Sequence, residues 1–416
     1  MASVILASLF HPSEVVALLQ YKFSPKVKYD YSNDKVRERI YYHLNNTSRS
    51  FSAVIQALDP ELKDPICIFY LVLRGLDTVE DDMTIDLDIK LPLLKSFHEI
   101  IYQPGWTFDK CGPKEKDRQL LVEFDIVIET FLKLKPEYQK IIADTTKRMG
   151  EGMAHYATAG VHVNTTEDFD QYCHYVAGLV GLGLSGMFSA CNFESPSVAK
   201  REDLSNSMGL FLQKVNITRD FLEDLRDNRH FWPKAIWGEY ADKMEDLAKP
   251  ENKEKAMECM SHMVHNALCH MQDVLEYLGQ IKNPSVFHFC AIPQVMAIAT
   301  LNMLQGNYNI FTTENVKIRK GETVWLMKES NNIDQVAAIF RLYARQINNK
   351  TNPLHRQFVD IGVLCGQIEQ TCVQKYPGST KELARLQAGV LAGQGKTVAV
   401  AAGVLGGAYA VKKYIL

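Results

Sequence analysis

The chain of 416 residues has little excess charge, since 46 Lys and Arg stand against 49 Asp and Glu and the formal net charge is −3. Broad nucleic-acid binding needs a basic excess, so no nucleic-acid partner is expected. Cysteines are few and odd in number, nine in all, which argues against a disulfide framework and indicates reduced thiols in a cytosolic environment. The mean hydropathy of −0.15 argues against a protein that crosses a membrane many times.

Strand patterns with paired turn signals are also scarce, and nothing resembles repeated β-α-β units. Apolar residues instead recur at three- and four-residue spacing in the ranges 35–58, 64–81, 118–150, 168–190, 203–226, 253–280 and 333–348. We therefore predict an all-α fold, a single large helical bundle. The apolar beginning of the chain has no basic region before it, so it is expected to be a first helix rather than a signal peptide.

The end of the chain differs in composition. The uncharged stretch from Thr397 to Val411 has 15 residues, about 22 Å as a helix, whereas a membrane span needs about 17–25 residues. Lys412 and Lys413 could snorkel and let the last three residues extend it. We predict a catalytic domain over 1–350, a connecting segment over 351–388 and a membrane anchor over 389–416. A packed or peripheral helix is the alternative for the last part.

An acidic pentapeptide of the form D-x-x-E-D occurs twice. The first copy runs from Asp77 to Asp81 and the second from Asp220 to Asp224, and each follows a strongly apolar helical run. On a helix the residues i, i+3 and i+4 share a face, so each copy is predicted to project three carboxylates one way. These carboxylates repel one another and stand at the unfavourable end of the helix dipole, which indicates that a cation offsets them.

All-oxygen ligands favour Mg²⁺ or Mn²⁺, and Mg²⁺ often completes its shell with substrate phosphates. Two facing carboxylate helices would hold a metal–diphosphate assembly between them, with Arg219 and Arg49 supplying positive charge to the diphosphate. A solvated, charged helix end is the alternative for each motif. The predicted metal ligands are Asp77, Glu80, Asp81, Asp220, Glu223 and Asp224.

Polar stripes run along both apolar helices that carry the motifs, and they indicate a wet functional cavity in the core of the bundle. The stripes comprise Tyr70, Arg74, Asp77 and Asp81 on the first helix, and Gln213, Asn216, Asp220 and Asp224 on the second.

Several segments, in order over roughly residues 35–330, resemble the eukaryotic squalene synthases: TSRSFSAVIQAL, CIFYLVLRGLDTVEDDMT, YCHYVAGLVGLGLS, NSMGLFLQKVNITRDFLED, FCAIPQVMAIATL and VKIRKG. The resemblance implies the isoprenoid-synthase fold with a central active-site cavity. It also implies head-to-head joining of two farnesyl diphosphates to presqualene diphosphate, then NADPH-dependent reduction to squalene in sterol biosynthesis. A monomer at the endoplasmic reticulum membrane, with the catalytic domain facing the cytosol, is expected.

The resemblance also assigns residues. Tyr172 matches a tyrosine near the first carbocation, and Phe289 matches an aromatic position near the second ionisation, where a ring face would stabilise a cation. Arg219 is the third residue expected to act in catalysis. Expected substrate contacts are Ser48, Arg49, Ser50, Phe51, Arg74 and Lys116. Candidate NADPH contacts are Gln213, Asn216, Lys317, Arg319 and Lys320.

Two alternatives for the function stay open. Gly186 stands where related enzymes commonly carry a basic residue, so a synthase that stops at presqualene diphosphate, or a phytoene-type enzyme without the reduction, is an alternative. A catalytically silent helical lipid-binding protein is another. The stretch from Gly181 to Gly186 matches G-x-G-x-x-G but lies in a helical run, so its glycines are expected to leave room for helix packing or substrate.

Overall fold

The computed structural model describes residues 11–23, 31, 33–158 and 163–388, and this part of the chain contains helices and no strand. The predicted all-α fold is therefore confirmed. The α-helices are α2 (Pro12–Phe23), α3 (Lys35–Thr47), α4 (Arg49–Gln56), α5 (Pro60–Asp81), α6 (Leu87–Ile100), α7 (Arg118–Val122), α8 (Phe124–Leu132), α9 (Pro136–Tyr156), α10 (Thr166–Cys173), α11 (Leu179–Ala190), α12 (Pro196–Lys200), α13 (Glu202–Arg219), α14 (Phe221–Arg226), α15 (Lys234–Trp237), α16 (Lys253–Leu268), α17 (Met271–Gln280), α18 (Pro284–Leu304), α19 (Lys320–Lys328), α20 (Ile333–Lys350) and α21 (Phe358–Lys375). Shorter helical turns are η1 (His174–Gly178), η2 (Met244–Ala248), η3 (Pro250–Asn252) and η4 (Tyr308–Phe311).

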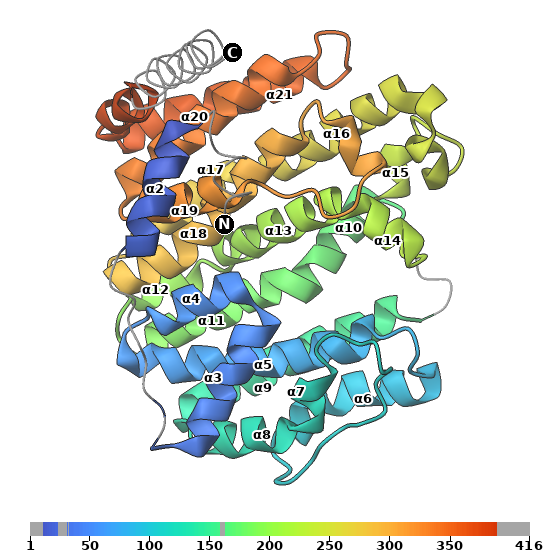
Figure 1. Ribbon diagram of the computed structural model, residues 1–416, viewed down its shortest axis with the longest axis vertical. Helices are drawn as coiled ribbons and strands as arrows, with labels where there is room; N and C mark the ends of the chain where they lie inside the picture. The colour runs from blue at the N-terminus through green and yellow to red at the C-terminus, as the bar shows by residue number, and fades with distance from the viewer. Residues whose placement is uncertain (1–10, 24–30, 32, 159–162, 389–416) are drawn as a thin grey trace, which may run out of the picture.

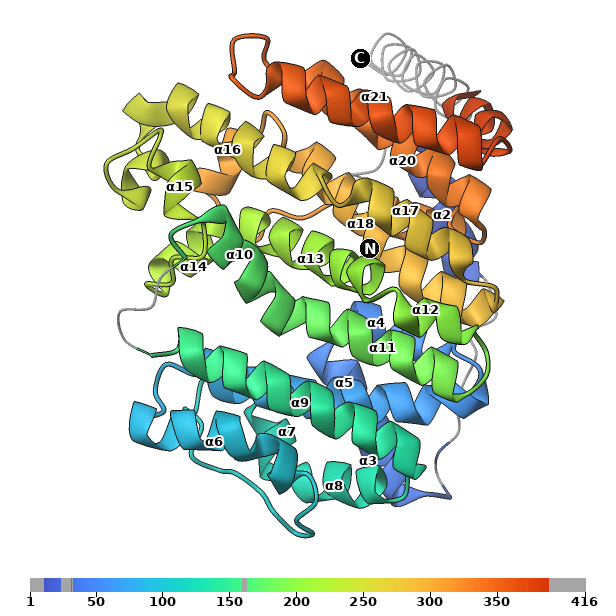
Figure 2. The ribbon, with the colours of Figure 1, turned by 180° about the vertical axis from the view of Figure 1, so that it is seen from behind.

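The helices lie side by side with α13 near the middle of the bundle (Figures 1 and 2). Helix α13 packs against α11, α16, α17 and α18, and it also contacts η1. On one side of this group, α11 packs on α9, which pairs with α5 and α6. On the other side, α18 packs on α20, and α20 pairs with α21. This order places α5 and α13, which lead into the two acidic motifs, on facing sides of one interior space.

Four of the predicted helical ranges are broken in the structure, and one of them is 253–280, which divides into α16 and α17. The range 35–58 breaks at Ser48, whose extended backbone ends α3 and whose hydroxyl accepts the amide of Phe51 at 3.2 Å to begin α4. The range 118–150 divides into α7, α8 and part of α9, and the range 203–226 breaks at Asp220. Apolar spacing continues across such breaks because local backbone geometry, rather than the periodicity, ends each helix.

Helix α18 is missing from the predicted ranges, although it has 21 residues. It is buried on nearly all sides, with 15 buried residues along its length, so its apolar residues follow no single stripe. A helix of this kind gives little periodic signal in a sequence.

One π-helical turn, η1, joins α10 to α11 inside the predicted range 168–190. Turns of this type insert a residue into a helix and are frequent at functional sites. This turn packs closely on α13, because a side chain at Gly209 would meet the carbonyl of Ala177. Likewise a side chain at Gly181 would meet the carbonyl of Ser205, so this glycine of the G-x-G-x-x-G stretch serves helix packing.

The expected connecting segment is helical and packed. Helix α21 lies along α20 and contacts α16 and α17 (Figure 2). The buried Arg341 donates to Glu369 at 2.7 Å across this contact, and Tyr376 donates to the carbonyl of Leu275 at 2.8 Å. The expected anchor, 389–416, lies outside the described residues, and the domain boundary near residue 350 stays a prediction.

Within the described residues, two helical segments are long and apolar enough to cross a membrane, Thr166–Ala190 and Pro284–Leu304. Both contribute residues to the interior cavity described below, and 39% of the first apolar window and 78% of the second are buried inside the bundle. All nine cysteines are described and carry free thiols.

Candidate active site

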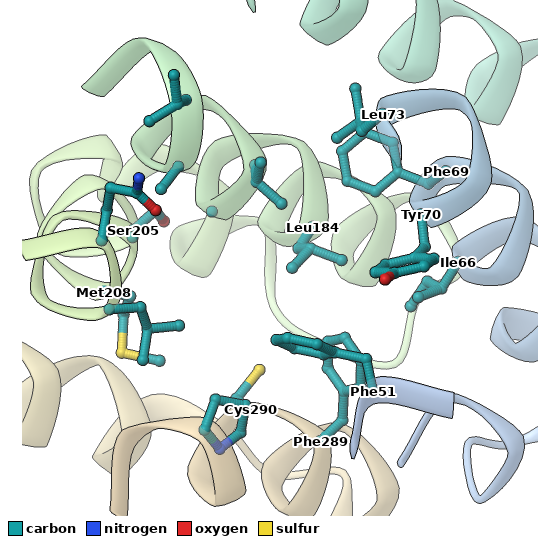
Figure 3. Close-up of a pocket in the computed structure, with 18 of the residues that line it drawn as sticks. Phe51, Ile66, Phe69, Tyr70, Leu73, Leu184, Ser205, Met208, Phe289 and Cys290 are labelled. Carbon is teal, nitrogen blue, oxygen red and sulfur yellow. The ribbon is translucent and has the colours of Figure 1, made fainter. Parts of the chain in front are cut away.

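An interior cavity of about 270 Å³ lies between α5, η1, α11, α13 and α18, with α4 beside it. Most of its wall is apolar, and Figure 3 shows the rings of Phe51, Tyr70 and Phe289 close to one another. Phe51 and Tyr70 lie 6.1 Å apart between ring centroids, and Phe289 meets Phe188 edge-to-face at 6.3 Å. Such a space suits a long hydrocarbon chain and excludes water.

Polar side chains enter this cavity from α5 and α13. Arg74 and Asp77 come from the last two turns of α5, and Gln213 and Asn216 come from the last two turns of α13. The predicted polar stripes therefore do face an interior cavity. Since the ends of the two helices lead to the acidic motifs, the polar end of the cavity lies beside those motifs.

The two motifs are joined by an arginine that the sequence analysis did not single out. Arg229 donates to Asp81 at 2.6 Å and lies 3.0 Å from a carboxylate oxygen of Asp224. It follows the second motif by only five residues, which is the one signal in the sequence that could have pointed to it. A single guanidinium thus offsets negative charge from both motifs.

The second motif does not lie on one continuous helix, and that prediction is wrong. Asp220 stands at the break between α13 and α14, with φ −88° and ψ 19°, and its carboxylate pairs with Arg219 at 2.6 and 2.7 Å. Glu223 accepts the amide of Asn315 at 2.6 Å. The three carboxylates of this motif therefore have three different partners.

Burial and mutual repulsion raise the pKa values of three motif carboxylates. Burial raises the pKa of Asp77 to about 7, with Arg74 opposing the shift, and it raises the pKa of Glu80 to about 8, with Asp81 and Asp77 adding to the shift. Burial also raises the pKa of Asp224 to about 7, against the effect of Arg229. Desolvated carboxylates of this kind favour a nearby cation.

Among the residues that the structure describes, no three carboxylate, histidine or cysteine side chains lie close enough together to bind one metal ion. The donor set nevertheless fits Mg²⁺ or Mn²⁺, because all six motif side chains offer oxygen atoms and the arginines balance only part of their charge.

Tyr172 lies at the acidic end of the site rather than in the wall of the cavity. It is 5% exposed and stacks on Phe231 with ring centroids 4.8 Å apart. Burial raises the pKa of its hydroxyl well above the usual value, and the charges of Glu80 and Asp81 raise it further. The phenol therefore stays protonated and can donate a hydrogen bond toward this end.

The predicted substrate contacts fall into groups. Phe51 and Arg74 line the cavity, and Arg74 is held by Tyr70 at 3.3 Å, by Asp77 at 3.8 Å and by Asp117 at 3.9 Å. The hydroxyl of Ser48 caps α4, and Lys116 is exposed outside the cavity. The side chains of Arg49 and Ser50 lie outside the described part. The sequence analysis did not single out Asp117, whose ion pair with Arg74 connects residues 116–117 to the site.

The candidate NADPH contacts do not come together. Gln213 and Asn216 line the apolar cavity, whereas Lys317 and Arg319 line a second cavity of about 460 Å³ between α2, α18, α19 and α20. Lys320 begins α19 and is exposed, and it lines neither of these two cavities. Helix α18 contributes to both cavities, with Phe289 in the first and Asn302 in the second.

Gly186 lies on α11 facing Ile141 of α9, and it does not line the apolar cavity. A Cβ atom there would meet Ile141 at 3.5 Å, an ordinary contact. The absence of a basic side chain at this position therefore leaves the wall of the cavity unchanged.

Comparison with known proteins agrees with this site. The family model described as squalene/phytoene synthase matches residues 44–322. The squalene synthase of Schizosaccharomyces pombe is 50% identical over 378 residues, covering 89% of this chain and 82% of the relative. The human squalene synthase is 49% identical over 348 residues, covering 82% of each chain. The solved structure of TcSQS in a ligand complex superposes with a TM-score of 0.79 at 39% identity, covering 81% of this chain and 98% of that one. The chain thus belongs to the squalene/phytoene synthase family, on the squalene synthase side of it.

Proposed function

We propose that this chain is a squalene synthase, which joins two farnesyl diphosphates head to head and reduces presqualene diphosphate to squalene with NADPH. One observation carries the proposal: the apolar cavity ends at a polar mouth where Arg229 links two acidic motifs. The family membership at about half identity to squalene synthases supports the same reaction.

The first chemical demand is the departure of diphosphate from an allylic carbon, which leaves a carbocation and a highly charged product. Bound Mg²⁺, or Mn²⁺, would act as a Lewis acid on that diphosphate, held by Asp77, Glu80, Asp81, Asp220, Glu223 and Asp224. Arg74, Arg219 and Arg229 line the same end and would bind the remaining phosphate oxygens. Their charges lie where negative charge develops, as transition-state stabilisation requires.

The second demand is that water stays away from the cation, since water would trap it as an alcohol. The apolar wall between α5, α11, α13 and α18 supplies that shield. Within the wall, Phe289 lines the cavity, where its ring would stabilise a cation. Tyr172, which keeps its proton, would donate a hydrogen bond or pass on a proton at the acidic end rather than act as a phenolate.

The reduction requires NADPH, and its phosphates need cationic partners. Lys317 and Lys320 are exposed and fit this role, with Arg319 between them. Gln213 and Asn216 would face the reactive end of the cofactor, because they line the cavity in which the hydrocarbon reacts. Bound NADPH supplies the hydride.

We further propose that residues 389–416 hold the chain, as a monomer, on the endoplasmic reticulum membrane with the catalytic domain facing the cytosol. The uncharged stretch 397–411 supports this placement. Deletion of 390–416 should give a soluble, active enzyme, and an unchanged membrane fraction after the deletion would assign the attachment to another segment.

Product analysis tests the reaction. The full chain is incubated with farnesyl diphosphate and Mg²⁺, with or without NADPH, and the extracted products are separated. We expect squalene with NADPH and presqualene diphosphate without it. Presqualene diphosphate alone in both samples would indicate a synthase that stops early, and a phytoene-type hydrocarbon would indicate a non-reductive enzyme. No release of diphosphate at all would indicate a silent lipid-binding protein, and squalene formed equally without NADPH would contradict the reductive step.

A further inference from the structure

Arg319 is held between two buried carboxylates that come from different helices. Its guanidinium lies 2.7 to 3.2 Å from the carboxylate oxygens of Glu14 on α2, and 3.0 Å from Glu322 on α19. Glu14 is 4% exposed and Glu322 is 8% exposed, and Tyr343 donates to Glu322 at 2.8 Å. Two carboxyl groups therefore contact a single guanidinium, so Arg319 is fully engaged by partners within the protein.

The second cavity opens beside this cluster. Its lining includes Lys317, Arg319 and Lys350, together with Glu14 and Glu322. The cavity thus offers cationic groups to an anionic ligand, but the guanidinium of Arg319 already has carboxylate partners. A phosphate that approached Arg319 would also meet the carboxylate of Glu14, and like charges at such short range repel strongly.

The segment that carries Arg319 is tied down at both ends. It runs from η4 to α19 across one face of the bundle (Figure 1). Near its start, Asn315 donates to Glu223 of the second acidic motif, and Glu314 pairs with Arg226. At its other end, Arg319 pairs with Glu14. The segment 312–319 therefore connects the diphosphate end of the active site to α2.

Helix α2 packs on α19 but buries few of its own side chains. Among its described side chains, only Glu14 and Ala17 are buried, whereas Val16, Tyr21 and Phe23 are 50%, 53% and 77% exposed. Its contacts are mainly with α19. Segments with few buried apolar contacts open at low free-energy cost, so α2 can separate from α19 without unfolding the bundle.

We propose that α2 covers the segment 312–319, and that Glu14 of α2 competes with an NADPH phosphate for Arg319. This competition would set the affinity of the protein for NADPH. This inference rests on the proposed use of NADPH. Glu14 is a positioning residue here, because it acts through Arg319 and touches neither the hydrocarbon cavity nor the acidic motifs.

The test compares Glu14→Gln and Glu14→Asp with Glu38→Gln, a matched change at an exposed glutamate on α3. Binding of NADP⁺ is followed by fluorescence, since Trp325 lines the second cavity, and KM for NADPH is measured separately from kcat. We expect Glu14→Gln to bind NADP⁺ about five- to tenfold more tightly, which is the effect of losing one repulsive contact. The shorter Glu14→Asp side chain should give a smaller gain, and Glu38→Gln should give none. Diphosphate release without NADPH should stay unchanged in all three.

A double-mutant cycle identifies the partner. In the Arg319→Gln background, Glu14→Gln should bring a clearly smaller gain, because no guanidinium is freed and only the repulsion between carboxylate and phosphate is relieved. Equal or weaker NADP⁺ binding in both Glu14 variants would overturn the inference while leaving the proposed function intact. If neither the wild-type chain nor the variants bind NADP⁺, and squalene forms without NADPH, the proposed reduction and the inference both fail.

Discussion

Asp81 at the end of α5 and Asp224 on α14 share one arginine, Arg229, at 2.6 and 3.0 Å. The side chain of Arg229 is 26% exposed, so this bridge lies at the mouth of the site rather than deep inside it. The bridge holds two acidic motifs together that would otherwise repel each other.

Substitution of Arg229 should raise the Mg²⁺ concentration that the enzyme needs. Arg229→Gln removes the charge-assisted hydrogen bond to Asp81, worth about 1.5–3 kcal/mol, and the ion pair with Asp224. We expect diphosphate release at limiting Mg²⁺ to fall about ten- to a hundredfold, since about 1.4 kcal/mol corresponds to tenfold. Arg229→Lys should recover part of the rate because it restores the charge without the fork. A Mg²⁺ titration that is the same in Arg229→Gln and wild type would contradict this role.

Neutralising one carboxylate in each motif should abolish the first step. Asp81→Asn and Asp224→Asn each remove a metal-binding oxygen and leave Arg229 with one partner fewer, so we expect at least about a hundredfold less diphosphate release. Asp227→Asn is the control, because its carboxylate is 60% exposed and lies 3.7 Å from Arg229. Retained release in both motif variants would refute a paired-metal site.

The ring of Phe289 should matter more for the second step than for the first. Phe289→Leu keeps an apolar side chain in the cavity but removes the π face, which is worth about 0.5–2 kcal/mol to a nearby cation. We expect presqualene diphosphate to accumulate and squalene to fall about tenfold in the presence of NADPH. Phe287→Leu, on the same helix but outside the cavity lining, should keep the wild-type product ratio.

Acid should destabilise the α3–α8 region through Glu123. Hydrogen bonds from Arg39 lower the pKa of this carboxyl to about 2, and Gln119 and His43 add to the effect. A lowered folded-state pKa gives stability that is present above pH ~4.5 and is lost as the pH falls toward ~2. Glu123→Gln should therefore be about 1–2 kcal/mol less stable at pH 7, because the pair is partly exposed.

The same variant should lose less stability than wild type between pH 5 and 3, as measured by urea unfolding at each pH. Glu137→Gln, at an exposed site on α9, should follow the wild-type curve. Parallel curves for Glu123→Gln and wild type would show that this carboxylate carries no acid-dependent stability.

The fold and the hydrocarbon cavity were predictable because both leave a periodic record in the sequence. Apolar residues at helical spacing predicted the bundle, and polar residues inside those apolar helices predicted that Arg74 and Gln213 face a cavity. Breaks were not predictable from the same record. Ser48 and Asp220 interrupt the helices through local backbone geometry, which apolar spacing does not register.

The contacts that join distant segments could not be predicted from the sequence either. Arg229 meets Asp81 across two helices, and Arg319 meets Glu14 near the start of the chain, and neither pair has a fixed spacing in sequence. The candidate cofactor residues divide between two cavities for the same reason, because α18 separates the regions that Gln213 and Lys317 line.

The π-helical turn η1 also sets the rotational phase of everything that follows it in α11. An α-helix turns about 100° per residue, so removal of one residue from 174–178 would rotate Gly181 away from the Ser205 carbonyl and Leu184 away from the hydrocarbon. The shape of the apolar cavity therefore depends partly on the number of residues in η1. A one-residue deletion at that turn would change the cavity wall along the whole of α11, whereas a single side-chain replacement changes it at one position.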